Sequence, residues 1–334
     1  MSAPTGWLGL VVGEWTITDD ARSCARRAVR AGRALGLRTL AVSTDERCLA
    51  RLAGDGWSMR PAFSPDPAGL AAAFTAGGNR AVAPVLLLGD GAEMSEPTAR
   101  VAALLGGRIP DPDAVALGAG VVVRQRVAVT AERNGIPPRR YLVQVQDGEV
   151  IGIVEDVTVD GQGRDYDCPG AVDWRTARAL RARTRAALEA AGLTRGPAEV
   201  TARANGRAVS VVHIAAGRID ACVASVIELA TGYDPILGAV RAAVAPATRP
   251  PHGRAARRLR RCASLRRADL QAMPAYADAA WVGLPGLVSA RPGPDGVVVT
   301  VADDQASAVR AAESAVDRLS GRIPAPVAAP GGTR

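Results

Sequence analysis

The sequence contains no lysine, so all 41 of its basic residues are arginines. A phosphate site built on lysine is therefore excluded, and arginine is a poor replacement because its planar fork needs a different geometry and a wider site. Against 33 acidic residues the arginines leave a net charge of +8, which permits nucleic-acid binding. Aromatic residues make up only 3% of the chain, so platforms on which bases could stack are scarce. The composition argues against a nucleic-acid-binding protein.

Histidine, paired cysteines and long apolar runs are also missing. With only His213 and His252, no Ser/His/Asp catalytic set can be assigned, and one histidine beside one carboxylate makes an incomplete zinc site. Five scattered cysteines without a C-x-x-C pair are typical of reduced thiols. The longest apolar runs, such as Val82 to Leu88, fall well short of the ~18 residues that span a bilayer. Since the N-terminus also lacks a signal-peptide pattern, we expect a cytoplasmic protein with no membrane contact.

Strand and helix patterns alternate through the first third of the chain. We predict strands at residues 7–12, 38–43 and 81–88, a helix that is capped by Asp19 or Asp20 and runs to residue 35, and helices at residues 68–75 and 93–105. This rhythm is typical of a parallel sheet covered by helices on both faces, and therefore of an α/β fold. At 334 residues, of which 48% are hydrophobic, the chain can form two or three domains with real cores.

Hairpin signals replace this pattern in the second part of the chain. After a helix predicted at residues 121–133, strands at residues 141–146 and 149–156 flank Asp147-Gly148, and a second strand pair flanks Asn205-Gly206. Between the hairpins, Asp173 caps a long helix that runs to Ala191. Two further helices are predicted at residues 221–230 and from Asp234-Pro235 onward.

A proline-rich linker at residues 246–253 precedes the last part. We predict an arginine-rich helix there, whose basic face is either solvated or docks an acidic partner or a phosphate. Its arginines are Arg254, Arg257, Arg258, Arg260, Arg261, Arg266 and Arg267. Strands at residues 286–290 and 297–301 and a helix at residues 304–319 follow, and residues 324–334 read as a disordered tail.

Four segments occur in an order that resembles the ATP-grasp superfamily, especially its biotin-carboxylase-like branch. The first three are RAVRAGRALGLRTLAVSTDE (residues 27–46), AVAPVLLLGDGAEMSEPTARVAALLGGRIPDPDAVALG (residues 81–118) and SVIELATGYDPILGAVRAA (residues 225–243). The fourth, residues 285–322, is similar to the closing two strands and helix of the family. The resemblance implies an N-terminal parallel-sheet (pre-ATP-grasp) domain at residues 1–118. A truncated ATP-grasp α+β lobe follows at residues 119–245, then a small C-terminal α+β segment at residues 254–322 and a disordered tail at residues 323–334.

The sequence departs from that family where the family binds ATP. The lid lobe of the family begins after the GIPP stretch, but here Pro137-Pro138-Arg139-Arg140 runs straight into a predicted strand, which leaves no room for a lid. The resemblance implies ATP and Mg²⁺ as cofactors, whereas the lysines of the family are absent and the cofactor stays undetermined.

The magnesium ligands implied by the resemblance are also largely replaced. Glu199 stands where the first metal-binding glutamate of the family belongs. The second glutamate falls at Val212 or His213, and the asparagine at Ile214 or Ala215. Arg218 matches the arginine with which the family binds an anionic substrate or phosphate, although a surface salt bridge would explain it as well.

These departures predict a catalytically degenerate homologue that acts as a binding or accessory subunit. The alternative is an active carboxylate–amine ligase derived from the ATP-grasp fold, or a small-molecule enzyme with an atypical site. In the first case we expect an acidic protein partner, an active paralogue or a small anionic ligand, and in both cases a homo-oligomer. Glu199 is the metal candidate and Arg218 the substrate-binding candidate.

Overall fold

The computed structural model describes twelve stretches of the chain. They are residues 6–12, 19–76, 84–89, 95–105, 138–158, 165–170, 172–193, 195–205, 208–244, 261–270, 284–291 and 296–320. The predicted helix at residues 121–133, the linker, the first arginines of the basic run and the tail lie outside these residues.

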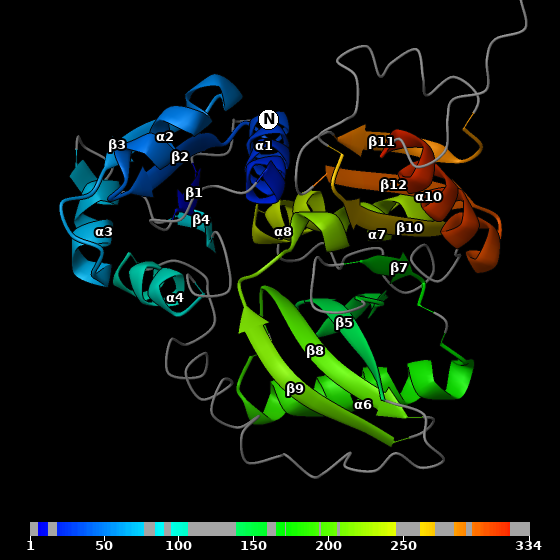
Figure 1. Ribbon diagram of the computed structural model, residues 1–334. Helices are drawn as coiled ribbons and strands as arrows, with labels where there is room; N and C mark the ends of the chain where they lie inside the picture. The colour runs from blue at the N-terminus through cyan, green and yellow to red at the C-terminus, as the bar shows by residue number, and fades with distance from the viewer. Residues whose placement is uncertain are drawn as a thin grey trace, which may run out of the picture.

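The N-terminal part is a parallel sheet covered on both faces, as predicted (Figure 1). Its strands are β1 (Trp7–Val11), β2 (Arg38–Ser43), β3 (Ser58–Pro61) and β4 (Pro84–Gly89), in the order β3-β2-β1-β4. Helices α1 (Asp19–Ala34) and α2 (Glu46–Leu52) pack on one face, and α3 (Pro67–Thr75) and α4 (Ser95–Leu104) on the other. Sequence patterns did not predict α2 and β3, which are too short to carry a clear period.

The rest of the chain is built on one antiparallel sheet of eight strands in the order β11-β12-β10-β7-β6-β5-β8-β9. Its strands are β5 (Arg139–Gln146), β6 (Glu149–Asp156), β7 (Tyr166–Cys168), β8 (Pro197–Asn205), β9 (Ala208–Ala216), β10 (Cys262–Ala268), β11 (Leu287–Arg291) and β12 (Gly296–Ala302). The two predicted hairpins are β5–β6 and β8–β9, and β10 joins the C-terminal strands to them through β7. The fold class is therefore the predicted one.

Helices cover this sheet from both sides. α6 (Trp174–Ala190) and α10 (Gln305–Leu319) pack on one face, and α7 (Ala221–Thr231) packs on the other face over β6, β7 and β10. Helices α1 and α8 (Pro235–Val244) lie between the two sheets, where Ile236 and Val240 share a core with Ala28 and Leu8 (Figure 1).

The first hairpin begins directly after Pro138, and its turn has the predicted geometry. Strand β5 starts at Arg139, and the two turn residues Asp147 and Gly148 have φ angles of 49° and 74°. Positive φ at both positions is what an Asp-Gly hairpin turn requires. Between Pro138 and the hairpin there is no additional lobe, as predicted.

The prediction of an arginine-rich helix is wrong for its described half, because Cys262–Ala268 form strand β10. Residues alternate between the two faces of the sheet here: Ala263 and Leu265 pack under α7, while Ser264 and Arg266 bond to Asp167. This alternation with a period of two is typical of a strand, but the many arginines in the segment favoured the interpretation as a solvated helix. Arg266 is an ion-pair partner in the sheet and not part of a solvated helix face.

Among the described helices, none is long and apolar enough to cross a bilayer by itself. Helices α7 and α8 reach that length and composition only as a pair, and they are bent by 94° at the break between them.

Candidate functional site

Strands β8 and β9 hold the two predicted site residues on neighbouring parts of one hairpin. Glu199 on β8 lies opposite Gln144 on β5 and opposite Ala215 on β9. β9 ends at Ala216, and Gly217 turns the chain with a φ of 73° while its N–H donates to the Pro197 carbonyl at 2.7 Å. The turn places Arg218 directly after the strand.

Gln144 holds this turn in place through two hydrogen bonds. Its amide nitrogen donates to the Ala198 carbonyl at 3.0 Å and to the Arg218 carbonyl at 3.3 Å. Gln144 is fully buried, so these bonds form away from water and hold the backbone firmly. The position of the Arg218 side chain is therefore set by the sheet and not by a loop.

Arg218 forms ion pairs with two carboxylates. Its Nη1 lies 3.4 Å from Glu199 Oε1, and its Nη2 lies 3.3 Å from Asp220 Oδ2. The side chain of Glu199 is 5% exposed and that of Arg218 is 16% exposed. Asp220 also caps α7, because its Oδ1 accepts from the N–H groups of Cys222 and Val223. We call these three residues the Arg218 cluster: Glu199, Arg218 and Asp220.

The register decides which residues face Glu199. Directly paired residues share a face of the sheet, so His213, opposite Thr201, and Ala215 lie on the face of Glu199. Ile214 packs in the core beneath α6, and Val212 is the extra residue of a β-bulge and is exposed. Of the positions left open by the resemblance, His213 and Ala215 are thus the ones beside Glu199.

This donor set does not fit Mg²⁺. The ion needs near-octahedral oxygen ligands, usually from one or two carboxylates with phosphates, and prefers them to imidazole. Here the carboxylate of Glu199 is already paired with Arg218, and the strand opposite offers an imidazole and a methyl group. Among the described residues there is no group of three His, Cys, Asp or Glu side chains that could hold a metal.

His213 lies in a positively charged part of the hairpin. Partial burial lowers its pKa below the usual value of 6.5, and the charges of Arg218 and then Arg140 lower it further. The imidazole is therefore neutral near pH 7.

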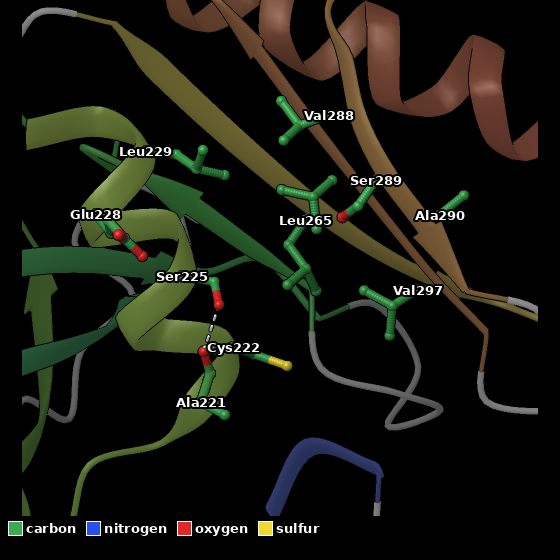
Figure 2. Close-up of a pocket in the computed structure, with 11 residues that line it drawn as sticks. Ala221, Cys222, Ser225, Glu228, Leu229, Leu265, Val288, Ser289, Ala290 and Val297 are labelled. Atoms are coloured by element: carbon green, nitrogen blue, oxygen red, sulfur yellow. Dashed lines mark hydrogen bonds between the residues drawn. The ribbon is translucent and has the colours of Figure 1, made fainter. Parts of the chain in front are cut away.

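A pocket of about 330 Å³ lies beside α7 (Figure 2). Its first lining residue, Ala221, directly follows Asp220 of the Arg218 cluster in the sequence. One face of α7 forms one wall, and strands β10, β11 and β12 form the other. The residues that line it are Ala221, Cys222, Ser225, Glu228, Leu229, Leu265, Val288, Ser289, Ala290, Val297 and Val299.

A second arginine cluster borders the pocket. Arg27 on α1 donates to Ser225 Oγ at 3.0 Å, ion-pairs with Glu228, and lies 3.1 Å from Asp234 Oδ1. Asp234 in turn accepts from the N–H groups of Ile236 and Leu237 in the first turn of α8. We call Arg27, Glu228 and Asp234 the Arg27 cluster.

Sequence analysis did not predict the pocket or the Arg27 cluster. The available signal was the spacing of Ala221, Ser225 and Glu228, small or polar residues on one face of an otherwise apolar helix. That pattern indicates a helix face that is not packed in the core. What lies opposite such a face is decided by strands β10, β11 and β12, which begin only at Cys262 and are not contained in the pattern of the helix.

Comparison with known proteins shows the fold. No family model matches the sequence, and no curated protein matches it. An L-amino acid ligase from Bacillus licheniformis superposes with a TM-score of 0.66 at 10% identity, covering 92% of this chain and 96% of that one. The biotin carboxylase domain of a single-chain bacterial carboxylase gives a TM-score of 0.63 at 14% identity, covering 92% and 88%.

A third structure agrees with these two. Glycinamide-RNase-transformylase T from Mycobacterium tuberculosis has a TM-score of 0.63 at 16% identity, covering 95% of this chain and 100% of that one. The protein has an ATP-grasp, biotin-carboxylase-like fold, as the resemblance predicted.

Proposed function

From an ATP-grasp, biotin-carboxylase-like fold, we propose that this protein is a catalytically degenerate form that acts as a binding or accessory subunit in the cytoplasm. The observation that carries the proposal is the pairing of Glu199 with Arg218. In an active metal site the carboxylate would face a cation and further oxygen ligands. Here the guanidinium of Arg218 takes the place of the cation beside Glu199, and the residues on the neighbouring strand are His213 and Ala215.

The arginines that follow Pro138 support the same proposal. Arg139 lies 3.0 Å from Glu155 and Arg140 lies 3.3 Å from Asp156, both within the β5–β6 hairpin. The carboxylates of these pairs are buried, whereas both arginine side chains are more than half exposed. Because each guanidinium already pairs with a buried carboxylate, a phosphate would have to compete with that carboxylate for it.

Calorimetry with ATP and Mg²⁺ tests the loss of the nucleotide site. We expect a dissociation constant of about 1 mM or weaker, which corresponds to only about 4 kcal/mol of binding free energy. A micromolar constant would support the alternative, an active carboxylate–amine ligase or other small-molecule enzyme with an atypical site.

Arg218 is the residue we propose for contact with a partner, through an acidic side chain of an active paralogue or a small carboxylate ligand. An incoming carboxylate competes with Glu199 and Asp220 for the same guanidinium. Titration with succinate tests this, and Glu199→Gln should strengthen binding because it removes one competitor. If Glu199→Gln instead abolished a metal-dependent activity, the degenerate function would be wrong.

A further inference from the structure

The pocket forms because α7 packs tightly on strand β6 but is separated from strands β11 and β12. Gly152 on β6 lies directly under Ile227, so close that a Cβ added at Gly152 would fall 2.5 Å from Ile227 Cδ1. Val223, Val226 and Ile227 fill the core on that side of the helix. On the far side, α7 faces β11 and β12 across the open space of about 330 Å³.

The walls of the pocket combine apolar and polar surface, with a somewhat larger apolar share. Leu265, Val297 and Val299 form its floor from the sheet, while Leu229 and Val288 close two sides. Polar atoms come from Ser225 and Glu228 on the helix and from Ser289 on β11 (Figure 2). A volume at the lower end of the range for small-molecule sites, with apolar walls and a few polar groups, is typical of a ligand pocket.

The Arg27 cluster brings negative charge to the pocket, while Arg267 brings positive charge near Cys222. In the Arg27 cluster one guanidinium pairs with two carboxylates, so the cluster has a formal net charge of −1. The Glu228 side chain is 45% exposed, whereas Arg27 is 16% exposed and Asp234 is 22% exposed. The excess charge is therefore most accessible at Glu228, which is the cluster member that lines the pocket.

We propose that this pocket binds a small amine, whose hydrocarbon part lies against the leucine and valine walls and whose ammonium group contacts Glu228. The Ser289 hydroxyl oxygen accepts a hydrogen bond from a second N–H group of the ammonium. Ser225 Oγ, which already accepts from Arg27 and donates to the Ala221 carbonyl, has one lone pair left for the third. The inference is independent of the anion site proposed at Arg218, because it uses a different arginine cluster and the other side of α7.

Three probes of nearly equal size separate the contributions of shape and charge: phenylbutylamine, phenylbutanol and phenylbutyrate. Titrated calorimetrically into the full chain, the amine should bind about fivefold more tightly than the alcohol, because a half-exposed carboxylate adds a modest charge–charge attraction. Phenylbutyrate should bind most weakly. Equal binding of amine and alcohol would overturn the role of Glu228.

Variants localise the binding. Glu228→Gln should bring the amine to within about twofold of the alcohol, while Glu313→Gln, which removes an exposed charge from the remote helix α10, should leave the preference unchanged. Ser289→Phe on the edge strand β11 fills the pocket from an exposed position, because Ser289 pairs with Val299 and lies on the face of the sheet that lines the pocket; it should weaken amine and alcohol alike.

Two results would overturn the proposal. If Ser289→Phe has no effect on the binding of either probe, the probes bind elsewhere. If phenylbutyrate binds most tightly, the pocket is an acid site that uses Arg267, whose Nη2 lies 3.7 Å from Cys222 Sγ.

Discussion

The two arginine clusters near α7 are built from the same parts and differ in burial. Each has one arginine between a glutamate and an aspartate, and in each the aspartate also caps the helix that follows it. Glu199 is 5% exposed and belongs to the sheet that carries Arg218, whereas Glu228 is 45% exposed and pairs with an arginine 201 residues away. The difference lies in the glutamates, because Glu199 is buried in the sheet whereas Glu228 is open to solvent, and the two arginines are equally exposed at 16%.

The largest expected effect is the loss of Arg218. Arg218→Ala leaves the buried carboxylate of Glu199 without its countercharge, and we expect the free energy of unfolding to fall by about 3 kcal/mol. Urea denaturation followed by circular dichroism measures it. The double variant Glu199→Gln/Arg218→Ala should recover a substantial part of the loss, because a neutral amide is cheaper to bury than an uncompensated charge.

Arg185→Ala is the matched control for that experiment. Arg185 pairs with Glu149 at 3.3 Å, but both side chains are more than half exposed. Its loss should cost about 0.5 kcal/mol. If Arg218→Ala cost no more than this, burial would not be the difference between the two kinds of pair.

A smaller effect is expected from Arg27. Arg27→Ala removes a tie between α1 and the helices α7 and α8, and should lower the free energy of unfolding by about 1.5 kcal/mol. Water hydrates the exposed Glu228 carboxylate when Arg27 is lost, so adding Glu228→Gln should restore little of the lost free energy of unfolding. A large recovery in this double variant would make the two clusters equivalent and contradict the comparison.

The smallest effect concerns pH. Because the pKa of His213 in the folded protein lies below its unfolded value, the unfolded chain binds a proton first as the pH falls. The stabilisation is complete above the unfolded value of about 6.5 and is lost as the pH falls through the folded value. Melting temperatures between about pH 7.5 and 5 should therefore fall less steeply in His213→Gln than in the parent. Parallel curves would show that neither burial nor the charges of Arg218 and Arg140 lower the pKa of this imidazole.

Local turn and cap chemistry made much of the fold predictable. Asp147-Gly148 identified a hairpin because few other residues accept positive φ at two successive positions, and Asp173 and Asp234 identified two helix starts. The pairing of Glu199 with Arg218 was not predictable, although each residue was a candidate. It depends on the register of β8 and β9 and on the bulge at Val212, which side-chain pattern does not reveal.

The pocket escaped prediction for a related reason. Its depth follows from the distance between α7 and the sheet, which Gly152 and Ile227 set from segments 75 residues apart. Strand β10 was mistaken for a helix because its arginines were read as a solvated face, when Arg266 in fact bonds to Asp167 inside the sheet.

The order of strands in the large sheet has a consequence for how the chain folds during synthesis. Strand β10 completes the edge of β7, and its Ser264 bonds to Asp167 across a separation of 97 residues. The parallel sheet is complete once α4 has emerged from the ribosome, but the antiparallel sheet waits for β12, a delay of roughly 10 to 40 s at typical elongation rates. For roughly 5 to 20 s of this delay, the time needed to add the 97 residues between Asp167 and Ser264, the short strand β7 has an open edge at which the nascent chain is exposed to incorrect strand pairing.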